Sequence, residues 1–200
     1  MTTRSLLKKV SARQIAACEV LLYGVMQQCT GQTKDKGIAL ALVSSHPGAG
    51  VSHLSELLEQ ILNQNDPDSA IALECGSLGY QEAMYEAAAD GERKQPALAH
   101  RALAGKLRDR AEHLMLLRDK YRLVLLDCHS LELKTDVLGL APMLEGVLLV
   151  VEGNKTTRSQ LDHLERTVEM AGGRIVGCVL NKRTYPIPAR INSWMERMGI

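Results

Sequence analysis

The sequence predicts an α/β fold: a single doubly wound, mostly parallel sheet with helices on both faces. Apolar runs of strand length alternate along the chain with longer segments of helical periodicity. The runs are apolar throughout, which is typical of strands buried on both faces of a parallel sheet. A length of 200 residues fits one domain. The expected strands cover 37–43, 69–74, 123–126, 146–151 and 174–180.

Helical spacing of apolar residues and capping residues set the expected helices. Ser11 is a candidate N-cap for the first helix and Thr157 for a later one, which Gly172 and Gly173 should end. We divide the single domain 1–200 into an N-terminal helical segment (1–36), a core (37–183) and a C-terminal helix (184–200). The expected helices cover 11–29, 54–62, 103–117, 134–143, 157–171 and 191–198.

Composition excludes several classes of protein. A net charge of +1 argues against a nucleic-acid-coating protein, and the absence of phenylalanine argues against a platform that stacks bases. The five cysteines form no CxxC pair, which favours a reducing compartment. The basic N-terminus lacks a signal-peptide core, and no run approaches the ~18 apolar residues of a membrane span. We therefore expect a cytoplasmic protein that reaches a membrane only through a partner.

The segment 44–53 has the layout of a phosphate-binding loop, because a glycine-rich turn joins a predicted strand to a predicted helix. In such a loop backbone N–H groups hold the phosphates, a lysine meets their charge and a hydroxyl binds Mg²⁺. Here Val51 stands in the lysine position, Ser52 in the hydroxyl position, and His53 follows. No nearby base is an obvious substitute, since Lys36 precedes the strand. The segment is therefore either a loop that no longer drives chemistry or merely a turn.

Other polar residues follow the predicted strands, where parallel sheets place their ligand sites. Ser52, Glu74 and Asp127 would form a remnant Mg²⁺ site, although Asp127 equally reads as the end of a strand. Zinc ligands of the right types also occur near this edge, but their spacing matches no known pattern. These are His46, His53, Cys128 and His129.

Four motifs in order resemble the P-loop ATPases of the MinD and ParA type, and most of all the cytoplasmic tyrosine-kinase domains of bacterial capsule and exopolysaccharide export. Residues 45–53 follow S-x-x-P-G-x-G-K-S-T except at the lysine and the threonine. Residues 121–129 follow the second acidic motif without its prolines. Residues 145–151 follow Asp-Gly-Val-x-Leu-Val-Val, and 177–181 follow Gly-x-Val-Leu-Asn. The resemblance covers roughly residues 11–190 and implies that Asn181 reads a nucleobase. The alternative for Asn181 is a turn that follows the strand.

Where the sequence departs from this family, it lacks residues that the family uses for catalysis, for subunit packing or as phosphorylation sites. The Asp-x-Asp motif becomes Glu74-Cys75-Gly76, so one acid is lost. Leu22 and Val25 replace the two arginines that help subunits of the family to pack in a ring. No tyrosine cluster follows Tyr185.

The resemblance and the departures together predict a catalytically degenerate kinase-like domain that serves as a regulatory or scaffolding subunit in exopolysaccharide or capsule biosynthesis and export. Its partner would be an inner-membrane polysaccharide co-polymerase or an active kinase, and it would be peripheral at that membrane; it would also form a homo-oligomer. ATP or ADP with Mg²⁺ would be held, if at all, without cleavage. The vestigial pocket would comprise Gly48, Gly50, Val51, Ser52, His53 and Asn181, with Glu74 and Asp127 as vestigial catalytic acids and Ser52 and Asp127 as metal ligands.

Two alternatives remain. In one, the chain is an active ATPase or tyrosine autokinase in which a partner supplies the missing cation. In the other, it is a placement regulator of the MinD type, although such proteins carry an earlier loop lysine that Ser45 and His46 do not provide.

Overall fold

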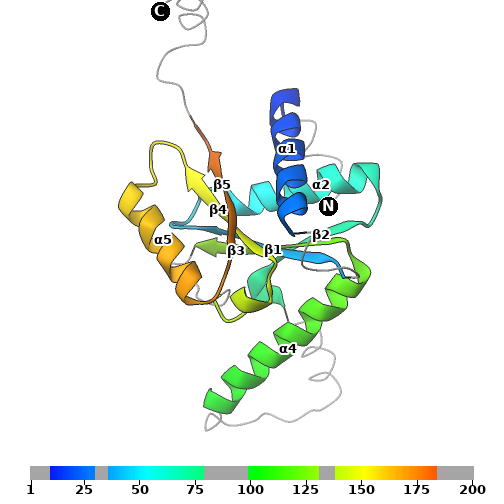
Figure 1. The fold of residues 1–200 in the computed structure, drawn as a ribbon, viewed down its shortest axis with the longest axis vertical. Helices are drawn as coiled ribbons and strands as arrows, with labels where there is room; N and C mark the ends of the chain where they lie inside the picture. The colour runs from blue at the N-terminus through cyan, green and yellow to red at the C-terminus, as the bar shows by residue number, and fades with distance from the viewer. Residues whose placement is uncertain (1–9, 30–35, 79–98, 131–137, 184–200) are drawn as a thin grey trace, which may run out of the picture.

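Five parallel strands form one sheet in the computed structural model, which describes residues 10–29, 36–78, 99–130 and 138–183 (Figure 1). The strands lie in the order β2-β3-β1-β4-β5, and each neighbouring pair is parallel. Their bounds are β1 Ile38–Ser44, β2 Ala70–Glu74, β3 Leu123–Ser130, β4 Gly146–Glu152 and β5 Ile175–Asn181.

Helices cover both faces of this sheet, which confirms the predicted α/β fold. The residues of α1 (Ala12–Cys29) and α2 (Val51–Asn65) pack into one apolar cluster with one side of the sheet. Those of α4 (Ala99–Lys120) and α5 (Arg158–Met170) pack into a second cluster on the other side. Figure 1 shows α1 and α2 together on one side of the strands. Among the described helices, none combines the length and the apolar character needed to cross a bilayer.

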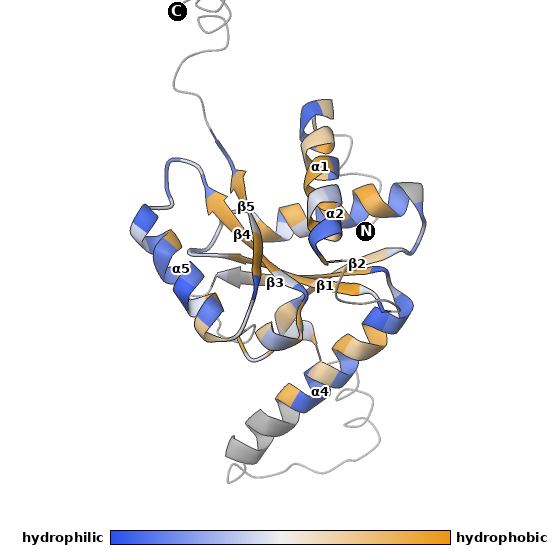
Figure 2. Cartoon of the chain, viewed as in Figure 1, coloured by the Kyte–Doolittle hydropathy of each residue, from blue (hydrophilic) through white to orange (hydrophobic). Residues whose placement is uncertain are grey.

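The central strand β1 shows why the strands are apolar throughout. Its Leu40 and Leu42 join the cluster under α1 and α2, while Ala41 and Val43 join the cluster under α4 and α5. Since both faces are covered, every residue of β1 is buried. Figure 2 shows that the strands inside the molecule are hydrophobic, whereas α5 has hydrophilic stretches. Four of the five cysteines are likewise buried.

The strand order places the predicted loop at the point where the winding of the chain reverses. From β1 the chain proceeds to β2 and β3 on one side, and it later returns to add β4 and β5 on the other side. β1 is therefore flanked by β3 and β4. Ligand sites of open parallel sheets lie beyond the strand ends at such a switch point. The loop that follows β1 occupies this place.

A buried ion pair holds the opposite end of the central strands. The Arg118 guanidinium contacts the Glu145 carboxylate, and the two side chains are only 12% and 7% exposed. Arg118 also donates from Nε to the Gly37 carbonyl at 2.9 Å and from Nη1 to the Met143 carbonyl at 3.3 Å. Glu145 Oε2 accepts the Ala39 N–H at 2.7 Å. The pair therefore joins α4 to the starts of β1 and β4.

The predicted caps are confirmed. Ser11 and Gln14 satisfy each other's backbone N–H groups at the start of α1, as Thr157 and Gln160 do at the start of α5. Helix α5 ends at Met170, just before Gly172, whose φ of 78° is in the left-handed region.

Two predicted elements differ from the structure. β3 does not end at Leu126 but continues to Ser130, because Ser130 still pairs with Ser44 of β1. The helix expected over 134–143 is wrong where the structure describes it, since residues 138–140 form a turn and Ala141–Met143 a single 3₁₀ turn. Pro142 in that turn lacks the N–H that an α-helix would need. The helix expected over 191–198 lies outside the described residues.

We predict that Glu145→Ala lowers the free energy of unfolding by about 3–5 kcal/mol, because it leaves the buried Arg118 charge without its partner. Urea denaturation followed by circular dichroism measures this loss. Lys36→Ala is the matched control, since it breaks an ion pair with Asp119 in which both side chains are more than half exposed. That change should cost at most about 1 kcal/mol. Similar losses for the two variants would contradict a structural role for the buried pair.

We also predict a pH-dependent contribution from Glu59 of α2. Burial raises the pKa of the Glu59 carboxyl above its ordinary value of 4.5, with a smaller rise from Glu56 and an opposing hydrogen bond to the backbone of Ala72. The folded state therefore binds this proton more tightly, and the free energy of unfolding falls as the pH rises from 4.5 through the raised pKa. Glu59→Gln should remove that fall and raise stability at neutral pH. Urea titrations at several pH values measure it, and an unchanged pH profile would refute it.

Candidate nucleotide-binding site

Residues 45–50, here called the loop, connect β1 to α2 through two left-handed glycines. Gly48 has a φ of 80° and Gly50 a φ of 95°, a region that glycine enters without steric cost. Ser44 Oγ donates to the His46 carbonyl at 2.9 Å and so closes the turn. Gly50 is the N-cap of α2 and provides no side-chain cap. The first N–H groups of α2 therefore face the loop without a side-chain acceptor from the cap, as in anion-binding helix starts.

A pocket of about 310 Å³ lies in front of the loop and is lined by Ser44, residues 47–53 and Ser130. We call it the loop pocket. Its volume is at the lower end of the range of small-molecule sites, roughly 300–1,000 Å³. Ser130, at the end of β3, is fully buried, and its Oγ has no hydrogen-bond partner among the described residues. Because buried hydroxyls are usually satisfied, this atom marks a place where a polar ligand group or a water fits.

Val51, which we expect to stand where a phosphate-binding loop has its lysine, has an aliphatic side chain that belongs to the core. It is 5% exposed and is part of the apolar cluster formed with α1 and α2. The next two residues, Ser52 and His53, are exposed and line the loop pocket. The loop pocket thus has its backbone donors and its hydroxyl, but no cation arises from position 51.

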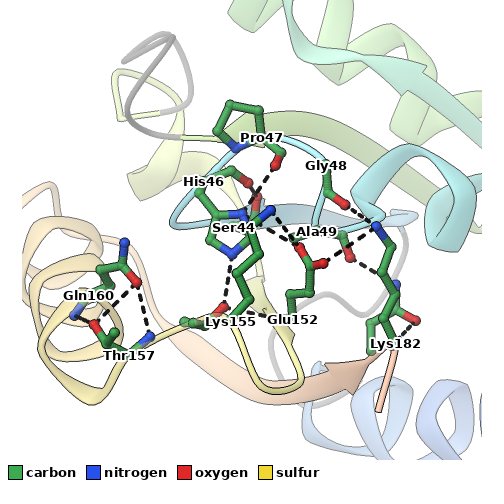
Figure 3. A network of polar contacts seen from close by, with 12 residues as sticks. Ser44, His46, Pro47, Gly48, Ala49, Glu152, Lys155, Thr157, Gln160 and Lys182 are labelled. Carbon is green, nitrogen blue, oxygen red and sulfur yellow. Dashed lines mark hydrogen bonds and ion pairs between the residues drawn. The ribbon is translucent and has the colours of Figure 1, made fainter. Parts of the chain in front are cut away.

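The end of β5 contacts the loop through two consecutive side chains, as Figure 3 shows for Lys182. Asn181 donates from Nδ2 to the Ala49 carbonyl at 2.9 Å, and Lys182 donates from Nζ to the Gly48 carbonyl. Lys182 N–H bonds back to Asn181 Oδ1 at 2.9 Å, and its φ of 53° is left-handed. Asn181, expected at a nucleobase, therefore supports the loop in this structure.

Glu152, at the end of β4, gathers three basic side chains beside the loop (Figure 3). Its carboxylate lies 3.7 Å from His46 Nδ1, 3.4 Å from Lys155 Nζ and 3.8 Å from Lys182 Nζ. The Glu152 side chain is only 15% exposed, so these contacts are partly shielded from water. The carboxylate thereby links the loop to the ends of β4 and β5.

Both ring nitrogens of His46 are already engaged. Nδ1 lies 3.1 Å from the Pro47 carbonyl, and Nε2 lies 3.2 Å from Thr156 Oγ1. Cys128 is buried, with Sγ 3.5 Å from the Leu126 carbonyl. Within the described residues no group of three or more His, Cys, Asp or Glu side chains is placed to hold a metal ion. The side chain of His129 lies outside them, so the zinc site suggested by these residues gains no support.

Glu74 and Asp127 lie on adjacent strands and are register partners between β2 and β3. Asp127 is 7% exposed, whereas Glu74 is exposed. Neither residue lines the loop pocket, which Ser52 does line. The structure thus brings the two predicted acids together, and a Mg²⁺ site at Ser52 and Asp127 stays a prediction.

The sequence analysis did not include Lys182 among the site residues. Its ammonium contacts the loop, whereas Val51 brings no charge there. A usable signal was present, because Lys182 follows Asn181 directly at a strand end. The position of β5 relative to the loop depends on the strand order, which one sequence does not reveal. Ser130 was missed because β3 was expected to end earlier.

Comparisons with known proteins identify relatives of the fold only. No family model matches the sequence, and no curated protein does. Among solved structures, the kinase domain of the Escherichia coli tyrosine kinase ETK is similar with a TM-score of 0.64 at 18% identity, over 88% of this chain and 79% of that domain. The VpsO kinase domain is similar with a TM-score of 0.57 at 18% identity, over 86% and 97%. The BceF tyrosine kinase domain gives 0.53 at 18%, over 78% and 72%. The fold is therefore similar to that of these kinase domains.

We predict that Gly48→Ala and Gly50→Ala destabilise the protein to different degrees. Both place a Cβ on a left-handed backbone, at a cost of about 1–2 kcal/mol. A Cβ at position 48 meets no atom within 4 Å, whereas one at position 50 would lie 2.3 Å from Asn181 Nδ2. Gly50→Ala should therefore lower the free energy of unfolding more, measured by urea denaturation.

Asn181→Ala provides the control for this pair of variants. It removes the atom that the new methyl group would meet, so in the Gly50→Ala background it should recover the excess loss. Equal costs for Gly48→Ala and Gly50→Ala would contradict the close approach of Asn181 to the loop.

Proposed function

We propose that this chain is a non-hydrolysing, tyrosine-kinase-like domain that acts as a regulatory or scaffolding subunit in bacterial exopolysaccharide or capsule biosynthesis and export. The observation that carries the proposal is Val51, a buried aliphatic residue in the position of the loop lysine. Phosphoryl transfer relies on positioned cations that stabilise charge as it develops on the phosphoryl oxygens. Val51 supplies no such charge.

Three features of the site support the binding of phosphate without its transfer. They are the two glycine conformations, the uncapped start of α2 and the loop pocket. These features support a domain that holds ATP or ADP with Mg²⁺ and does not cleave it. Ser52 and Asp127 are the proposed metal ligands, and Glu74 a vestigial acid.

The proposed partner is an inner-membrane polysaccharide co-polymerase or an active kinase. The support is the resemblance of four motifs and the likeness of the fold to tyrosine-kinase domains. Val20 and Tyr23 on α1 are 73% and 69% exposed, and we propose that they contact the partner or a second copy. In this proposal the chain is cytoplasmic and peripheral at the inner membrane through that partner.

The second candidate is an active ATPase or autokinase with a non-standard loop. One observation favours it: the Lys182 ammonium contacts the loop from the neighbouring end of β5. In this alternative Lys182, or a cation from a partner, would assist transfer while Ser52 and Asp127 bind Mg²⁺.

Phosphate release from Mg-ATP by the purified protein separates the two candidates. We expect no release above that of the Asp127→Asn variant, and no tyrosine phosphorylation on immunoblots, because an absent cation of this kind lowers rates by about 10³–10⁵-fold. ATP turnover that disappears in Asp127→Asn would overturn the scaffolding proposal.

Restoring the loop tests whether its backbone still holds nucleotide. Val51→Lys combined with His53→Thr should raise the affinity for Mg-ADP by about 10-fold or more, since a charge-assisted contact contributes about 1.5–3 kcal/mol. It should also lower the melting temperature, because an ammonium replaces a core side chain. Calorimetric titration and thermal denaturation measure both effects.

Val51→Met with His53→Thr is the matched control, with a long side chain but no charge. It should leave the affinity for Mg-ADP unchanged. If the lysine variant gains no affinity either, the loop does not hold phosphate.

A further inference from the structure

The loop pocket shows two independent signs of an anionic ligand. The start of α2 presents N–H groups that no side chain of the N-cap residue satisfies. Ser130, from the end of β3, adds a fully buried hydroxyl without a hydrogen-bond partner among the described residues. A phosphate oxygen would satisfy donors of both kinds. What the loop itself lacks is a charge to balance that anion.

The side chain of Lys182 brings a charge to this place from another strand. Its Nζ donates to the carbonyl of Gly48, and its Cε lies 3.8 Å from the point where a Cβ on Gly50 would stand. Gly48 and Gly50 both line the loop pocket. The lysine side chain is half exposed, so it is free to change rotamer.

Glu152 holds this lysine beside the loop. Its Oε1 lies 3.8 Å from Lys182 Nζ, while its Oε2 is contacted by Lys155 and His46. The Lys182 charge is therefore partly neutralised and directed at a carbonyl. An incoming phosphate chain would compete with the carboxylate for the ammonium.

We propose that Lys182 replaces the missing loop lysine in binding the phosphate chain of a nucleotide. When a di- or triphosphate occupies the loop, the Lys182 ammonium leaves the Gly48 carbonyl and Glu152 and pairs with the phosphate oxygens. This inference rests on the proposed function, because it assigns the cation for a nucleotide that is held and not cleaved.

The same geometry explains why binding need not bring catalysis. A catalytic cation stands in place before charge develops and costs no reorganisation during the reaction. Lys182 reaches the phosphates only after it breaks two contacts. It therefore contributes to the affinity for the bound nucleotide and little to a transition state.

Titration of the full chain with ADP and with pyrophosphate, each with Mg²⁺, tests the proposal. Lys182→Ala should weaken binding of both probes by about 10- to 100-fold, the effect of one charge-assisted contact. Lys155→Ala is the matched control, because it removes an equal charge from the same carboxylate but does not contact the loop. It should change affinity by less than about 3-fold, the effect of a surface charge. Glu152→Gln should tighten binding, since it releases Lys182.

A double substitution makes the test independent of folding defects. Val51→Lys with His53→Thr should gain more affinity in the Lys182→Ala background than in the wild-type background, because only there is the cation missing. Melting temperatures of all variants show that each is folded at the temperature of the titration.

Several results would overturn the proposal. One is equal affinity of wild type and Lys182→Ala for the probes, and another is an equal gain in affinity from the loop substitutions in the two backgrounds. The others are a loss of affinity for ADP but not for pyrophosphate, and no binding of either probe by wild type at millimolar concentration. None of them bears on turnover, so the scaffolding role would survive, although a lack of binding by wild type would remove the bound nucleotide from it. ATP hydrolysis by wild type would overturn the scaffolding proposal. The role of Lys182 in binding would still be decided by the titration.

Discussion

The Arg118–Glu145 ion pair sets the positions of the two central strands on which the whole site depends. It links the carbonyl of Gly37 and the N–H of Ala39 to the start of β4 and to α4, in a place from which water is largely excluded. A strand advances about 3.3 Å per residue, so fixing where β1 and β4 begin also fixes where they end. β1 ends at the loop and β4 at Glu152. The pair thus aligns, from the far end of the sheet, the two segments that meet beside the loop pocket.

The loop combines a preserved backbone with a changed distribution of charge. Its left-handed glycines and the start of α2 keep the geometry of a phosphate cradle. The charge that normally arises within such a loop is instead found around it, on Lys182 and Glu152. Backbone geometry and charge have therefore separated in this chain. Under our proposal this separation favours binding without chemistry, because holding an anion requires donors and a mobile countercharge, whereas transferring a phosphoryl group requires a fixed one.

Local signals in the sequence predicted most of the fold. Apolar runs located the strands, Ser11 and Thr157 located helix starts, and the glycine-rich turn located the loop. Apart from the helix expected over 134–143, the errors concern contacts between distant segments. β4 lies between β1 and β5, yet Lys182 still contacts Gly48. No pattern within a single stretch of chain encodes that meeting, since it depends on the order of strands. The length of β3 was likewise decided by its pairing with β1 rather than by its own residues.

The buried position of Val51 also has a consequence for changing the loop. Its side chain is part of the interior that α1 and α2 share, so it is surrounded by apolar residues. A lysine there would place an ammonium among these residues, and compensating changes in the helices would have to accompany it for the interior to stay well packed. Position 51 is therefore coupled to the residues of both helices, and no charged side chain enters it without a loss of stability.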